Sequence, residues 1–250
     1  MIPKKINYLE AYSFADFTVR AVRDPSCVAP GDIIGDFFGF KEPEFYEQIE
    51  RPRQYTLLHS FIHAINGFPI QHYLGKIDGE IIVNEYGSLF DGAGIAPPMW
   101  FNAAEVEDHL DELRPILEDA TGIITGAAFQ LLFADRTFLF EFAKFIRPFV
   151  MQLRPVDHPS IRAPGIIQRA YFPTWLKNAV FHRDKGRCQL CGCDLTNILV
   201  PTTERHIDHM VPLKAGGTND PTNFQLTCEP CNTSKGAQVH ATHHLSYPWW

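Results

Sequence analysis

The feature that most constrains this chain is a pair of Cys-x-x-Cys motifs, Cys188 to Cys191 and Cys228 to Cys231. Two thiolates on one tight turn span an edge of a tetrahedron, so two such turns supply the four ligands of a structural zinc site. The alternatives are a redox-active Cys-x-x-Cys and two pairs of buried thiols, but a redox pair needs no matching second pair. The spacing therefore predicts one structural Zn²⁺. Cys193 is surplus to four ligands and is left out of the predicted site.

Length and composition place the chain among ordinary globular proteins. Its 250 residues are 45% hydrophobic and 20% charged, which excludes a long disordered chain and a coiled coil. No apolar run reaches the ~18 to 20 residues that a membrane-spanning helix needs, and the N-terminus lacks the pattern of a secretory signal. We therefore expect a cytoplasmic protein with reduced cysteines and no membrane contact. The formal charge of -7 also excludes a broad basic surface.

The composition changes once along the chain. Of 20 phenylalanines, 17 lie between Phe14 and Phe149. Residues 172–250 carry seven Lys and Arg against six Asp and Glu, so the remaining 15 against 23 give residues 1–171 a net charge of -8. Prolines are dense between the two parts and favour extended backbone there. We predict an acidic, Phe-rich N-terminal domain over 1–154, a linker over 155–171, a second domain over 172–240 and a tail over 241–250.

The N-terminal domain is predicted to mix helices and strands. Apolar residues recur at helical spacing over 54–66, and residues 103–118 and 136–149 also have a helical pattern. Residues 75–85 have the pattern of a β-hairpin that turns at Asp78 and Gly79. None of these elements indicates a chemistry, so the function must be sought further along the chain.

The segment between the two cysteine motifs predicts a strand, an irregular loop, a second strand and a helix. Residues 206–213 read HIDHMVPL, followed by a Gly-Gly-Thr-Asn loop, by NFQL at 223–226, and by a helix that starts near the second motif. With the Arg-Asp-x-x-x-Cys-x-x-Cys start and the Cys-x-x-Cys-Asn-x-x-Lys end, residues 172–237 resemble the HNH endonuclease family. This resemblance implies an α+β chain that ends in a small ββα-metal domain with a four-Cys zinc site.

The resemblance implies hydrolysis of DNA phosphodiester bonds, with roles for five residues. His209 would be the general base, and its unperturbed pKa near neutrality suits that role. Asp208 and Asn232 offer hard oxygen donors for a catalytic Mg²⁺ or Mn²⁺, although many members have His where this chain has Asn232. Asn223 would clamp the loop, while His206 could bind metal, bind phosphate or fill space. In an extended strand Asp208 and His209 point to opposite faces, so only a bend or bulge would bring them together.

Four basic residues lie near this segment and could contact backbone phosphates: Lys235, Arg205, Lys214 and Arg187. The acidic N-terminal domain is not suited to reading DNA by charge, so we expect residues 1–154 to bind a protein partner, a second copy of the chain or a signalling ligand. A targeted, assembled or regulated nuclease of this kind would fit a defence system or a mobile element. The alternative is an inactive zinc-bound interaction module, which would have no need for the candidate catalytic residues.

Overall fold

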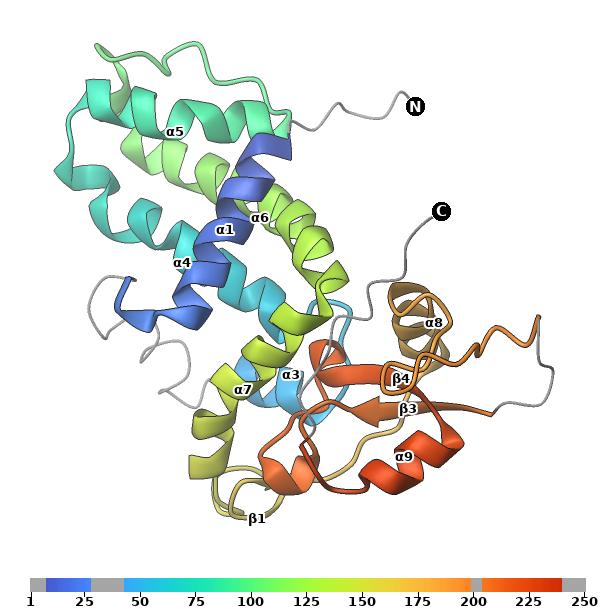
Figure 1. The fold of residues 1–250 in the computed structure, drawn as a ribbon. Helices are drawn as coiled ribbons and strands as arrows, with labels where there is room; N and C mark the ends of the chain where they lie inside the picture. The colour runs from blue at the N-terminus through green and yellow to red at the C-terminus, as the bar shows by residue number, and fades with distance from the viewer. Residues whose placement is uncertain (1–7, 28–42, 199–203, 240–250) are drawn as a thin grey trace. The chain divides into compact units, whose positions relative to one another are not determined.

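The computed structural model describes residues 8–27, 43–198 and 204–239, and its described elements are mostly helices (Figure 1). The predicted tail over 241–250 lies outside these residues. The α-helices are α1 (Tyr8–Arg23), α3 (Pro43–Glu50), α4 (Leu57–Tyr73), α5 (Gly79–Ala93), α6 (Leu110–Ala134), α7 (Arg136–Gln152), α8 (Thr174–Arg183) and α9 (Glu229–Lys235). The strands are β1 (Ile161–Ala163), β2 (Ile166–Ile167), β3 (Arg205–His209) and β4 (Phe224–Cys228). Short 3-10 helices are Pro25–Cys27, Leu74–Lys76, Val106–His109, Leu213–Ala215 and Pro221–Asn223.

The chain divides into two compact units, and the division is not at the predicted linker. One unit takes Met1–Phe37 with Leu58–Leu132, and the other takes Phe38–Leu57 with Phe133–Trp250. The second unit therefore includes α3 and α7, which lie within the predicted N-terminal domain. The predicted linker carries the antiparallel pair β1–β2 and belongs to this second unit.

The described part of the first unit is helical, and the predicted hairpin over 75–85 is wrong. The Asp78 side chain accepts a hydrogen bond from the Ile81 backbone N–H, so Asp78 is the N-cap of α5 rather than a turn residue. Buried α5 residues recur at helical spacing from Ile82 to Ala93. Gly94 ends the helix at φ 65°, in the left-handed region that glycine adopts readily. Asp78 and Gly79 therefore begin a helix in this chain, where the sequence pattern predicted a hairpin turn.

Helix α6 supplies much of the core of the first unit. Its buried side chains include Leu113, Leu117 and Ile124. Among the described residues, Val106–Ala134 is the stretch long and apolar enough to cross a membrane by length and composition. Buried core helices of soluble proteins have the same composition, so this match is weak evidence for a membrane span.

The second unit contains the predicted strand–loop–strand–helix segment. Strands β3 and β4 pair antiparallel, α9 packs on β3 and β4, and α8 packs on β4 (Figure 1). The α8 side of the hairpin buries a hydrophobic cluster that includes Leu176, Val180, Phe224 and Leu226. Alternate residues of each strand face opposite sides of the pair, so this cluster fixes which side chains face away from it.

Candidate functional site

Alternation along β3 sorts the candidate residues onto two faces. The pairing of β3 with β4 runs without a shift from Arg205 to His209, with Asp208 opposite Gln225 and His209 opposite Phe224. This pairing contains no bulge that would bring Asp208 and His209 to one side. Asp208 and His206 therefore share the face that meets α9, and His209 points to the opposite face.

The His209 side chain is buried among aromatic rings. It is 5% exposed, and its ring centroid lies 4.6 Å from that of Phe224 and 5.7 Å from that of Phe172. Burial lowers its pKa to about 4, against the opposing effects of the Asn219 hydrogen bond and the Asp208 charge. The imidazole is therefore neutral near pH 7, as a general base must be.

Asn219 determines which nitrogen of His209 carries the proton. Its Nδ2 donates to the backbone oxygens of Glu50 and Gln168 at 2.8 Å, and its Oδ1 accepts from the Ala170 N–H at 3.3 Å. The same Oδ1 lies 3.2 Å from His209 Nε2. Because this oxygen can only accept, Nε2 carries the hydrogen and the lone pair is on Nδ1.

The Asp208 carboxylate receives two hydrogen bonds on one oxygen. Gln225 Nε2 and Lys235 Nζ each donate to Asp208 Oδ2 at 2.9 Å, and within the described residues neither bonds to Oδ1. Lys235 Nζ also donates to the His209 backbone oxygen at 2.7 Å, and the residue is 2% exposed. Lys235 thus ties α9 to β3 from inside, and its amine is not on the surface where a phosphate contact was predicted.

Asn232 lies on α9 next to His206. Its Nδ2 is 3.3 Å from His206 Nδ1, and because an amide nitrogen only donates, His206 Nδ1 is the acceptor. The oxygen of the Asn232 amide on α9 and Oδ1 of Asp208 on β3 are then hard oxygen donors on two elements that pack together. A carboxylate with an amide oxygen suits Mg²⁺ or Mn²⁺, so the residues present fit the predicted catalytic ion.

Asn223 holds the loop between the strands. Its Oδ1 accepts from the Val211 N–H, and its Nδ2 donates to the backbone oxygens of Val211 and Thr218, all at 2.9 Å. The Gly217 backbone lies so close to Val211 that a Cβ at this position would collide with the Val211 carbonyl oxygen.

Asp220 is a second anchor of this loop. It is fully buried, and its side chain accepts a hydrogen bond from the Leu57 N–H at 2.7 Å. Burial raises the pKa of Asp220 to about 6.

This arrangement of strand, loop, strand and helix agrees with the comparisons with known proteins. Residues 188–238 match the family model of the HNH endonucleases. They form an HNH domain. The match points to a nuclease-type enzyme and to nucleic acid as the class of substrate. The search of curated proteins gave no match, and neither did the search of solved structures.

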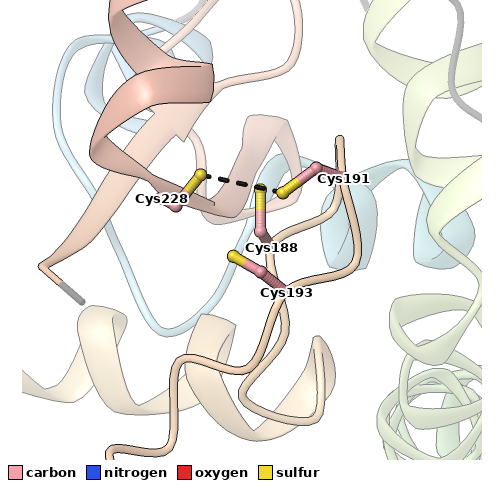
Figure 2. A group of neighbouring side chains, drawn as sticks. All are labelled: Cys188, Cys191, Cys193 and Cys228. Atoms are coloured by element: carbon pink, nitrogen blue, oxygen red, sulfur yellow. Dashed lines mark hydrogen bonds between the residues drawn. The ribbon is translucent and has the colours of Figure 1, made fainter. Parts of the chain in front are cut away.

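The HNH domain also contains a group of thiols that could hold Zn²⁺. Figure 2 shows Cys188, Cys191 and Cys193 from the loop after α8 and Cys228 from the end of β4, with their sulfur atoms turned toward one another. All four sulfurs lie within 4.8 Å of one another. This group has Cys193 where the spacing predicted Cys231, although the Cys231 thiol also interacts with Cys191 and Cys228.

The protonation of these thiols is uneven. Burial acts to raise the pKa of Cys191, but hydrogen bonds, first from the Cys193 backbone, outweigh it and lower that pKa to about 7. Burial, followed by the neighbouring Cys191 thiol, raises the pKa of Cys193 to about 12. Thiolates this close repel one another, so a bound cation is what would allow four to ionise together.

The Arg-Asp pair that precedes the first cysteine motif aligns β4. Arg183 and Asp184 form a buried ion pair at 2.8 Å. Asp184 accepts from the Leu226 N–H at 2.7 Å, and Arg183 donates to the Phe224 backbone oxygen at 2.6 Å. This motif therefore holds the backbone of β4, the strand that carries Gln225, in place.

The other predicted phosphate contacts occupy different surroundings. Lys214 is exposed on the 3-10 turn of the loop, whereas Arg187 donates to the Gly192 oxygen within the cysteine loop. Arg205 stacks on Phe181 and lines a cleft of about 420 Å³ between α8 and β3, together with Lys177, His182, Asn178, Thr174, Ile207 and Leu226. Lys214 and Arg205 thus remain the accessible cations near the HNH domain among the four predicted.

Three residues of the site were not predicted from the sequence: Asn219, Gln225 and Arg136. Gln225 could have been found, because a predicted β3–β4 pair places it opposite Asp208. No local pattern distinguishes Asn219 from other loop amides. Arg136 lies at the start of α7, 89 residues from its partner Gln225.

Proposed function

We propose that this chain is a metal-dependent HNH endonuclease that hydrolyses phosphodiester bonds of DNA. The observation that carries the proposal is the face between β3 and α9 within a matched HNH domain, where Asp208 pairs with Lys235 and His206, on the same face of β3, contacts Asn232. Asp208 and Asn232 would hold Mg²⁺ or Mn²⁺, and the bound ion would stabilise charge on the phosphate and the departing oxygen.

His209 is the proposed general base. The Asn219 amide holds its Nε2–H, so Nδ1 is the atom that would take the proton from the attacking water. His209 is 5% exposed and lies on the face of β3 opposite to Asp208, so it meets neither bulk water nor the proposed ion. The base role therefore requires two changes when substrate binds: Phe172 must move aside, and the end of β3 must bend to bring His209 toward Asp208. His206 is the second candidate, because it shares a face with Asp208 and its side chain is 32% exposed.

Cleavage by two histidine variants distinguishes these bases. Zinc-loaded full-length protein is incubated with duplex DNA and Mg²⁺ or Mn²⁺, and the products should carry 5′-phosphate and 3′-hydroxyl ends. We expect His209→Ala to reduce the rate by about 10² to 10⁴-fold, the usual contribution of a general base, with zinc content unchanged. His72→Ala on the surface of the first unit is the matched control. A larger loss in His206→Ala than in His209→Ala would assign the base to His206.

We propose that the first unit serves targeting, assembly or regulation through a protein partner or a second copy of the chain. Tyr8 and Tyr12 on α1 are 54% and 60% exposed, which leaves aromatic surface available for such a contact. Sedimentation of the full chain and of Tyr8→Ser/Tyr12→Ser tests self-association. A monomer at all concentrations for both proteins would leave only a different protein as the partner.

The inactive zinc-bound interaction module is the alternative function. Two observations favour it. Lys235 already pairs with the Asp208 carboxylate, and burial shields the His209 imidazole from solvent. The two functions differ in metal stoichiometry. A nuclease should bind a divalent ion in addition to zinc, whereas the module should bind zinc alone.

A further inference from the structure

A chain of hydrogen bonds connects α7 to the candidate catalytic carboxylate. Arg136 Nη2 donates to Gln225 Oε1 at 2.6 Å, and Gln225 Nε2 donates to Asp208 Oδ2 at 2.9 Å. Arg136 is 8% exposed and Gln225 is 1% exposed. Arg136 lies 52 positions before Cys188, where the HNH match begins, so the matched domain does not contain it.

The chemistry of these groups fixes their orientation. A guanidinium has donors only, so the Gln225 atom that faces Arg136 must be the amide oxygen. The amide nitrogen is then directed at Asp208, where only a donor is useful to a carboxylate. Without Arg136, the Gln225 amide could turn over and present its oxygen to Asp208, which would repel the carboxylate.

Arg136 is itself held firmly. It is the first residue of α7, directly after the N-cap Asp135, whose side chain accepts from the Thr137 and Phe138 N–H groups. Asp184 also lies near its guanidinium and favours the charged form, while burial is the larger effect and lowers its pKa to about 10. Arg136 therefore stays charged at neutral pH, and its donors remain available to Gln225.

We propose that Arg136 is a positioning residue of the nuclease centre: through Gln225 it holds Asp208 by Oδ2 and leaves Oδ1 for the catalytic ion. This inference rests on the proposed function only in that Asp208 binds a divalent ion. Its consequence is that a residue outside the HNH match sets the affinity for the catalytic metal.

The test is Mn²⁺ binding to the zinc-loaded full-length protein, measured as free Mn²⁺ by electron paramagnetic resonance. Loss of a partner that orients a metal ligand typically weakens metal affinity by about 10 to 100-fold, so we expect that loss in Arg136→Met and in Gln225→Met. The double variant should bind no more weakly than either single one, because both changes break the same connection. A contact that only stabilised the fold would leave the Mn²⁺ affinity of the folded, zinc-loaded variants unchanged.

Arg147→Met is the matched control, since Arg147 is also on α7 and, within the part of the chain that the structure describes, its hydrogen bond goes to the Ala215 backbone oxygen near the loop. It should bind Mn²⁺ like the wild type. Wild-type affinity in Arg136→Met, multiplied effects in the double variant, or no Mn²⁺ binding by the wild type would each overturn the proposal. If Arg136→Met loses its zinc and circular dichroism signal, Gln225→Met decides, and wild-type affinity in that variant also overturns it.

DNA cleavage is measured on the same samples to separate the two proposals. Weakened Mn²⁺ binding in Arg136→Met, with no cleavage by the wild type on any DNA, would support the positioning role and contradict the endonuclease. Cleavage by the wild type, with unchanged Mn²⁺ binding in Arg136→Met, would support the endonuclease and contradict the positioning role of Arg136.

Discussion

Replacing Asn223 by alanine should loosen the loop that carries the site. The side chain is 1% exposed and makes three hydrogen bonds, to Val211 N–H, Val211 C=O and Thr218 C=O. A buried hydrogen bond contributes about 0.5 to 1.5 kcal/mol, and an unsatisfied buried group costs about 1 to 3 kcal/mol. With three backbone groups left unpaired, we expect Asn223→Ala to lower the free energy of unfolding of the second unit by about 4 kcal/mol.

Hydrogen–deuterium exchange is the appropriate assay, because it measures β3 and β4 without interference from the first unit. In Asn223→Ala the slowest-exchanging amides of these strands should exchange faster, by the factor that a loss of about 4 kcal/mol in the free energy of unfolding gives. Asn178→Ala is the control, since Asn178 is exposed on α8 and its replacement should change stability by less than ~0.5 kcal/mol. A loss below ~1 kcal/mol in Asn223→Ala would show that these bonds do not hold the loop.

Three further predictions follow from the second unit. The motif spacing makes Cys231 the fourth zinc ligand, whereas the group of neighbouring sulfurs contains Cys193. If two matched Cys-x-x-Cys turns complete the tetrahedron, Cys231→Ser should reduce the zinc content from about one per chain to near zero while Cys193→Ser retains it, as measured by atomic absorption; the opposite result would assign the fourth ligand to Cys193. The pKa of Asp220 is raised from 3.8 to about 6, so between these pH values the folded state keeps a proton that the unfolded state loses. The free energy of unfolding should therefore fall by about 3 kcal/mol as the pH rises from 3.8 to about 6. Denaturant titrations of Asp220→Asn should lack this dependence on pH. A fragment of residues 165–250 should fail to fold, because the partners from α3 and α7 are missing; a well-dispersed NMR spectrum of the zinc-loaded fragment would contradict this.

The sequence predicted those parts of the site that depend on local pattern. Alternating apolar residues indicated β3 and β4, and the polar Gly-Gly loop indicated the irregular connection. The role of Asn223 could be anticipated because its bonds reach back only 5 and 12 residues. The thiol group follows from motif spacing, apart from the choice between Cys193 and Cys231.

The rest could not be predicted because it depends on partners that are distant in the chain. Asn219 bonds the Glu50 backbone 169 residues away, and Asp220 bonds the Leu57 N–H 163 residues away. Lys235 was expected on the surface because helical spacing does not show which side of a seven-residue helix meets the strands. Asp78 and Gly79 were misread because the same residue pair suits a hairpin turn and a helix N-terminus.

The end of α3 and the first residue of α4 anchor the loop, which has a consequence for biosynthesis. Residues 49–57 leave the ribosome long before Asn219 and Asp220, which they will hold. During translation the backbone groups of Glu50 and Leu57 therefore have no partner in the loop until the 169 and 163 residues that separate them from Asn219 and Asp220 have been made. The site around His209 is completed only after Asn219 reaches them, so a nascent or truncated chain that lacks this loop has no assembled nuclease centre to release into the cell.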